Sequence, residues 1–136
     1  MNFNIDCVRA VLLELEDRLA IEVDEVGSIS NNHVRPADLV DILGDDFRQE
    51  EIYYVLKKLG EEGYIKLFAM NADNLFLIYY IDEMTFKGHQ FIETIRPQPV
   101  WDKTKEAVKK FGSASFSFIA QVAGEALASY FKGTIA

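Results

Sequence analysis

The strongest constraint on the fold is the order in which two kinds of apolar pattern follow each other along the chain. Helical spacing of apolar residues predicts an amphipathic helix at about residues 4–18, a short helix from Pro36 to Gly44, and a third helix at about residues 49–62. Two stretches rich in aromatic and branched residues follow, "YIKLFAM" and "LFLIYYID", with the turn sequence "NADN" between them. The predicted order is therefore helix, short helix, turn, helix and two-stranded hairpin.

The segment between the first two helices has a different composition. Residues 26–33, "VGSISNNH", contain Gly, Ser and Asn and show no apolar periodicity. This composition is typical of a connection, so we expect a polar loop here. In the short helix that follows, Leu39, Ile42 and Leu43 are expected to form the apolar side.

The predicted order resembles that of a winged helix-turn-helix domain. The residues "MTFKG", directly after the second strand, resemble the Leu-Thr-x-x-Gly step by which many winged-helix regulators leave the wing for their next helix, with Met84 in place of Leu. Thr85 can cap that helix, and Gly88 allows its first turn to approach neighbouring backbone closely.

The C-terminal part is predicted to contain two further helices. Pro97 and Pro99 end the fourth helix, because a proline disfavours helical conformation in the residue before it. A fifth helix at residues 100–111 is expected to dock through Trp101, with stacking on a base as the minor alternative for that ring. A sixth helix, capped by Ser115, carries an apolar stripe wider than a monomer's surface helix needs, which predicts a homodimer through this helix. The stripe comprises Phe116, Ile119, Val122, Ala123, Ala126, Leu127, Tyr130 and Phe131.

These elements together predict an α+β, mainly helical fold. Three helices and a two-stranded hairpin form a winged helix-turn-helix, and a C-terminal helical extension follows. We expect the winged-helix domain at residues 1–96 and the two-helix extension at residues 97–136, within one compact unit.

The C-terminal half contains a set of residues with a recognisable spacing. They are Gly88, His89, Phe91, Ile95, Arg96, Val100, Trp101, Lys103, Thr104, Lys105, Gly112, Ser115 and Phe116. Through these residues the chain resembles a family found in bacteria and their phages, domain of unknown function 2513. The resemblance implies a small cytoplasmic protein from a phage or mobile element, and it brings no catalytic residues to carry over.

Charge is unevenly distributed along the chain. The formal net charge is -8. Up to Glu83 there are 18 acidic and 7 basic residues, and after it there are 4 acidic and 7 basic residues. The first part therefore repels nucleic acid at long range, and the second part weakly attracts it.

No pattern of catalytic or metal-binding residues occurs. His89 has Glu93 one helical turn away, but the chain has only two His and one Cys, with no nucleophile elbow and no phosphate-loop motif. We therefore expect no enzyme, no metal and no cofactor, a buried Cys7 in a reducing cytoplasm, and a structural role for His89. Residues 116–131 are too short and too polar for the ~20 apolar residues of a membrane span.

The third helix provides the candidate contacts to a partner. Its outward residues Arg48, Gln49, Tyr53, Lys57 and Lys58 are of types that reach base edges or phosphates, which favours a DNA-binding regulator. Four glutamates share the helix, and the wing tip contains Asp73 and no Lys or Arg. The alternative is a protein-interaction module in which the winged helix is a scaffold and its acidic face recruits a basic partner.

Overall fold

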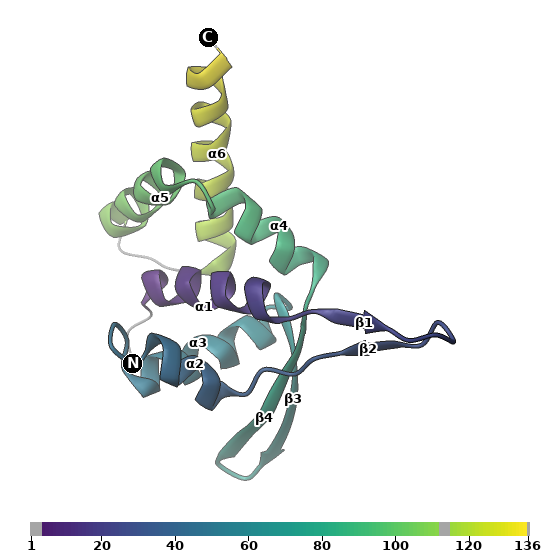
Figure 1. The fold of residues 1–136 in the computed structure, drawn as a ribbon. Helices are drawn as coiled ribbons and strands as arrows, with labels where there is room; N and C mark the ends of the chain where they lie inside the picture. Colours follow the sequence, from purple (N-terminus) through teal and green to yellow (C-terminus); the bar gives the residue numbers. More distant parts are fainter. Residues whose placement is uncertain (1–3, 112–114, 136) are drawn as a thin grey trace. The chain divides into compact units, whose positions relative to one another are not determined.

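The computed structural model describes residues 4–111 and 115–135. It divides into two compact units, one of residues 4–89 and one that begins at Gln90. The elements and their order along the chain are shown in Figure 1. The predicted α+β, mainly helical fold is confirmed, because α-helices account for most of the described residues and the strands form two small antiparallel hairpins.

Helix α1 (Ile5–Arg18) is the amphipathic helix that the spacing predicts. Asn4 caps it, since its Oδ1 accepts hydrogen bonds from the backbone N–H groups of Asp6 and Cys7. The apolar side of α1 is fully buried and packs against α2 and α3. Burial also raises the pKa of the Cys7 thiol to about 12, with a further contribution from Glu51, so this thiol is not a nucleophile.

Helices α2 (Pro36–Leu43) and α3 (Gln49–Glu61) begin in the same way. At each start an arginine backbone N–H donates to the carboxylate three residues further on: Arg35 to Asp38 at 3.0 Å, and Arg48 to Glu51 at 3.0 Å. The acidic side chain thereby replaces a conventional cap. Leu39 and Leu43 are buried in α2, but Ile42 is exposed, so its predicted place on the apolar side is wrong.

The wing is the antiparallel pair β3 (Ile65–Ala72) and β4 (Leu75–Met84), as predicted. Gly63 ends α3 with a φ of 79°, and Asp73 turns the hairpin with a φ of 52°. The inner face of the wing packs on α3, and Ile81 is completely buried. A single bridge between Ile81 and Val34 adds the segment before α2 to the same sheet.

A second hairpin, not a polar loop, connects α1 to α2. Strands β1 (Ile21–Val23) and β2 (Ile29–Asn31) pair antiparallel, and we call residues 20–32 the arm. Asp24 Oδ1 accepts from the N–H groups of Val26 and Ser28, and Gly27 has a φ of 91°. The prediction was wrong here because backbone pairing and side-chain hydrogen bonds hold these strands together. Apolar burial, which sequence periodicity reports, contributes little.

Helix α4 (Phe86–Ile95) starts at the joint predicted from "MTFKG". Thr85 Oγ1 donates to the carbonyl of Gly63 at 2.6 Å and accepts from the N–H of Gly88 at 3.1 Å. A Cβ at position 88 would collide with the carbonyl oxygen of Tyr64, so only glycine fits. The capping role of Thr85 and the close approach at Gly88 are both confirmed.

In the unit that begins at Gln90, α5 (Gln98–Phe111) packs against α6 (Phe116–Ile135). Trp101 is 1 % exposed, so the alternative of base stacking is wrong. Ser115 Oγ caps α6 by accepting a hydrogen bond from the N–H of Phe118.

The apolar stripe of α6 is buried only in its first half, since Tyr130 and Phe131 are exposed. Gly112 of the predicted connection lies outside the described residues. Among the helices described, none is both long and apolar enough to cross a bilayer.

Candidate nucleic-acid interface

Helix α3 is fixed at its N-terminus and along one side. Ile52, Val55, Leu56 and Leu59 are buried in the core of the 4–89 unit. Glu51 accepts a hydrogen bond from Asn4 Nδ2 at 2.8 Å and another from the backbone N–H of Arg48. These two bonds, that of Asn4 first, lower the pKa of the Glu51 carboxyl below its ordinary value. The start of α3 is therefore bonded directly to the residue that caps α1.

The opposite side of α3 is open. Gln49, Tyr53 and Lys57 follow each other at intervals of four residues, so their side chains form one row along the helix. Arg48 precedes the row with a side chain that is 72 % exposed. Of the predicted contact residues, the structure thus brings Arg48, Gln49, Tyr53 and Lys57 to one open surface, which we call the α3 row.

Lys58 lies beside this row and is engaged with its own helix. Its Nζ donates to Glu61 at 3.1 Å and lies 5.4 Å from the ring centroid of Tyr54. The hydrogen bond to Glu61 raises the pKa of the Lys58 ammonium. The ammonium charge of Lys58 is therefore partly balanced within its own helix.

The cations near the α3 row have local partners as well. Arg48 Nε lies 3.6 Å from Glu51, and Lys57 Nζ lies 5.6 Å from the ring centroid of Phe76 on the wing. Glu50, Glu51 and Glu61 lie on the same helix as these cations. The α3 row is therefore a mixed polar surface rather than a basic patch.

An open groove of about 830 Å³ is lined by the C-terminal half of α3 and by the wing. Its charged lining residues are Lys57, Glu61, Lys66 and Asp82. Lys66 donates to Glu83 at 2.9 Å, and this bond raises the pKa of its ammonium. Sequence reasoning missed Lys66 because it belongs to the wing, and only the folded structure brings it to the same groove as Lys57 of α3. Ile65, Leu67, Ala69 and Phe76 supply the apolar part.

The outer face of the wing is apolar and half exposed. Phe68 lies opposite Tyr80, and Met70 lies opposite Leu77, so these four residues share one face. The ring of Tyr80 stacks on Phe68 at a centroid distance of 5.0 Å and on His33 at 3.8 Å. We call Phe68, Met70, Leu77 and Tyr80 the outer wing patch. The sequence places no Lys or Arg between Lys66 and Lys87, so the wing offers its partner little positive charge.

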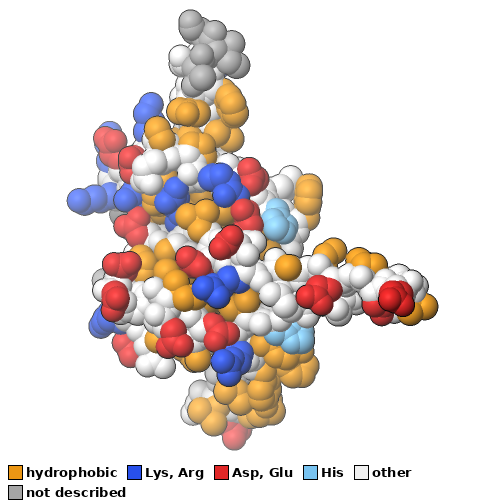
Figure 2. All heavy atoms as spheres, viewed as in Figure 1, with side chains coloured by type: hydrophobic (Ala, Val, Ile, Leu, Met, Phe, Trp, Pro, Cys, Tyr) orange, Lys and Arg blue, Asp and Glu red, His pale blue; other side chains and the backbone are white. Residues whose placement is uncertain are grey.

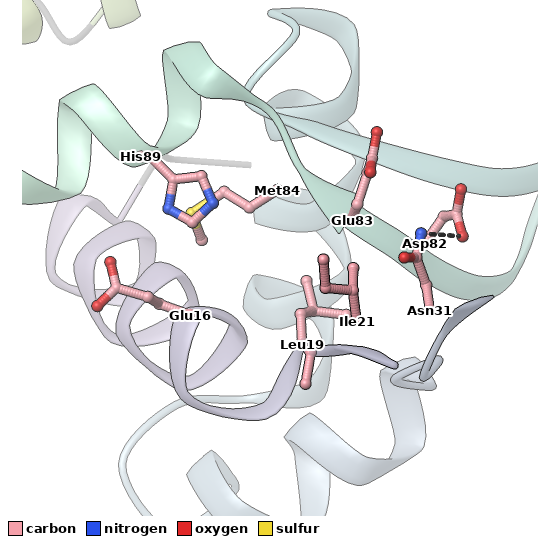
Figure 3. Close-up of a pocket in the computed structure, with 9 residues that line it drawn as sticks. Glu16, Leu19, Ile21, Asn31, Asp82, Glu83, Met84 and His89 are labelled. Carbon is pink, nitrogen blue, oxygen red and sulfur yellow. Dashed lines mark hydrogen bonds between the residues drawn. The ribbon is translucent and has the colours of Figure 1, made fainter. Parts of the chain in front are cut away.

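His89 lies at the surface next to the buried joint of Thr85 and Gly88. Its side chain is exposed and lines a pocket of about 290 Å³. Figure 3 shows the imidazole beside Met84, with Glu16 of α1 across the pocket and Asp82 and Glu83 of β4 beyond. Thr85 and Gly88 therefore make the joint, and His89 occupies the helix surface. Trp101, the other residue of the sequence signature, belongs to the core of the unit that begins at Gln90.

Acidic, His and Cys side chains are the groups of the described residues that could hold a metal ion. No group of three or more His, Cys, Asp or Glu side chains in these residues has the geometry to hold a metal ion. His33 lies 3.6 Å from Asp82, and both side chains are about half exposed.

Comparisons with known proteins agree with the family resemblance. The family described as "Hypothetical protein (DUF2513)" matches residues 2–115. The crystal structure of Bacillus subtilis PadR in complex with operator DNA is similar at 17 % identity and a TM-score of 0.44, covering 90 % of this chain and 92 % of that chain. No curated protein matches this chain in sequence. Because the match spans most of its length, the chain belongs to the DUF2513 family.

Proposed function

We propose that this chain is a DNA-binding regulator that places the α3 row on duplex DNA. The observation that carries the proposal is the open row itself: Gln49, Tyr53 and Lys57 lie along one helix side, with Arg48 at its start. Arg and Gln are the side chains best suited to base edges in the major groove, and Lys and Tyr suit phosphates. The proposed contacts are thus Arg48, Gln49, Tyr53 and Lys57, with Lys58 as a weaker contributor.

A single copy offers few cations, so we also propose that the regulator is a homodimer. The α3 row contains two cations, whereas affinity for duplex DNA rises with each phosphate that is neutralised. Two copies would double this number and place two recognition helices on one duplex. The end of α6 supports this proposal, since Tyr130 and Phe131 are exposed and adjacent. A monomeric mass at micromolar concentration by light scattering would contradict the dimer and leave the α3 row to be tested separately.

The test of DNA binding is fluorescence anisotropy with a random duplex at two salt concentrations. We expect binding at low salt, and a log–log salt slope of roughly -3 to -4 if the four cations of two α3 rows each contact a phosphate. Arg48→Ala combined with Lys57→Ala should weaken binding by at least about tenfold and flatten the slope. Arg18→Ala combined with Arg96→Ala removes the same charge from surfaces outside α3 and serves as the control.

The outer wing patch favours a second function, recognition of a protein. Exposed apolar side chains on one sheet face are typical of protein interfaces and contribute little to phosphate binding. If the duplex does not bind at low salt, the DNA proposal fails and protein recognition becomes the first choice. In either case we propose that the protein acts in the cytoplasm, where the free thiol of Cys7 stays reduced.

A further inference from the structure

We propose that the arm and the pocket at its root bind an extended, cationic segment of a partner protein. This inference does not depend on DNA binding, because it concerns a different surface of the 4–89 unit. The arm is the element that the winged-helix order does not require, and each of its four branched apolar side chains is more than 60 % exposed.

The apolar residues of the arm gather on one side. Ile21 lies opposite Asn31 and Val23 lies opposite Ile29, so Ile21, Val23 and Ile29 share one face of the two-stranded sheet. They are 62 %, 63 % and 68 % exposed, and Val26 at the tip is 89 % exposed. Figure 2 shows apolar side chains along one side of the arm and acidic ones along the other. Three β-branched residues held this far out of the core are costly to leave in water, so a partner would gain by covering them.

The backbone of the arm is also open to a partner. The N–H of Asn32 donates to the carbonyl of Ala20, and the N–H of Asp24 donates to the carbonyl of Ser28. In an antiparallel pair the residues between such bonds alternate, so the N–H and C=O groups of Ile21 and Val23 point away from β2. An added strand can bond to these groups and lay its own side chains beside the apolar face.

The pocket at the root of the arm determines the charge of the partner. Ile21 and Asn31 belong to both the arm and the pocket, which makes the two surfaces continuous. Glu16, Asp82 and Glu83 line the pocket, and no Lys or Arg is among its lining residues (Figure 3). Glu83 is paired with Lys66 at 2.9 Å and Asp82 lies 3.6 Å from His33, so the negative charge of the pocket is partly balanced. Leu19 and Met84 are apolar lining residues of the same pocket. A lysine or arginine side chain, with its apolar stem and charged end, has the matching chemistry.

The arm itself strengthens this preference. Between Leu19 and His33 the sequence has Glu22, Asp24 and Glu25 and no Lys or Arg. Nucleic acid is therefore repelled from this surface, and a small organic cation would fill the pocket but leave Val23 and Ile29 uncovered. The partner that satisfies both features is a protein segment in which apolar and basic residues alternate.

The test uses the full chain and three labelled synthetic peptides of equal length, alternating Val with Lys, Ser with Lys, or Val with Glu. By fluorescence anisotropy we expect the Val-Lys peptide to bind, and the other two to bind at least about tenfold more weakly.

Variants of the chain locate the binding surface. Val23→Ser combined with Ile29→Ser should lower the affinity for the Val-Lys peptide by about tenfold, and Glu16→Gln should lower it by about threefold. Leu75→Ser at the similarly exposed wing tip and Asp41→Asn on α2 are the matched controls, and circular dichroism melts verify folding.

Three results would overturn the proposal. Equal binding of the Val-Lys and Ser-Lys peptides would indicate attraction to an acidic protein in general. Equal losses of affinity for the Val-Lys peptide in the arm variants and the control variants would show that the peptide binds to another surface. Full displacement of the Val-Lys peptide from the unsubstituted chain by spermidine would identify a small cation as the occupant.

Discussion

The two hairpins of the 4–89 unit differ in what holds them, although both are antiparallel and both project apolar side chains. The wing is held through one buried face, with Ile81 at 0 % exposure, and through the Val34 bridge. The arm is held by its own hydrogen bonds: Asp24 closes its turn, and Asn32 bonds to the backbone of Arg18 and Ala20 at its root. The wing is therefore part of the core, whereas the arm is an attachment to it.

The largest expected effect contrasts a buried wing residue with an exposed arm residue. Ile81→Ala should lower the free energy of unfolding by about 2–5 kcal/mol, because it leaves a cavity in the core. Val23→Ala should change it by less than about 0.5 kcal/mol, because its side chain is already in water. Urea denaturation followed by circular dichroism measures both. Similar losses for the two variants would contradict the distinction between the hairpins.

The next effect tests the joint behind the wing. Gly88→Ala should lower the free energy of unfolding by about 1–3 kcal/mol, since the new methyl group collides with the Tyr64 carbonyl. Gly124→Ala is the control: its Cβ would meet no atom within 4 Å, and alanine in a helix should stabilise it by about 0.5–1 kcal/mol. His89→Ala, at the residue for which the sequence predicted a structural role, should change the melting temperature very little, because the side chain is exposed.

A smaller, local effect is expected in the arm. Asp24→Ala removes both side-chain bonds that close the turn, and should speed amide exchange in β1 and β2 several-fold without moving the global melting temperature. Asp45→Ala, at an exposed turn between α2 and α3, is the control. A drop in global stability with Asp24→Ala would show that the arm is part of the core after all.

The smallest effect concerns pH and the start of α3. Hydrogen bonds from Asn4 and Arg48 lower the pKa of Glu51 below its ordinary value of 4.5. A lowered pKa adds stability that is present above pH 4.5 and lost as the pH falls through the folded-state value. The stability difference between the wild type and Glu51→Gln should therefore shrink on acidification. A difference that is independent of pH, or equal to that of the Glu50→Gln control, would contradict this role of Glu51.

The same contrast explains what could be predicted from the sequence. Elements that bury a periodic apolar face were found, including α1, α3 and the wing, and so was the joint at Thr85 and Gly88, whose residue types match their geometry. The arm was missed because its three apolar strand residues face water and its stability comes from Asp24 and Asn32. The exposure of Ile42 was missed because periodicity indicates a face and does not reveal whether anything packs on it.

The candidate sites divide in a similar way. The α3 row could be named from helical spacing alone, since residues 49, 53 and 57 share a side of any helix. The groove with Lys66 and the pocket with Glu16, Asp82 and Glu83 each join segments far apart in the chain. No local pattern marks such a combination, so only the folded structure reveals it.

The central claim is that two surfaces of the 4–89 unit serve different partners, with duplex DNA on the α3 row and a cationic protein segment on the arm. Hydrogen exchange with mass spectrometry, recorded with and without a random duplex at low salt, tests it most directly. We predict slower exchange in α3 when the duplex is bound, and unchanged exchange in β1 and β2. Protection of the arm by the duplex, or bound duplex with no protection of α3, would contradict the claim.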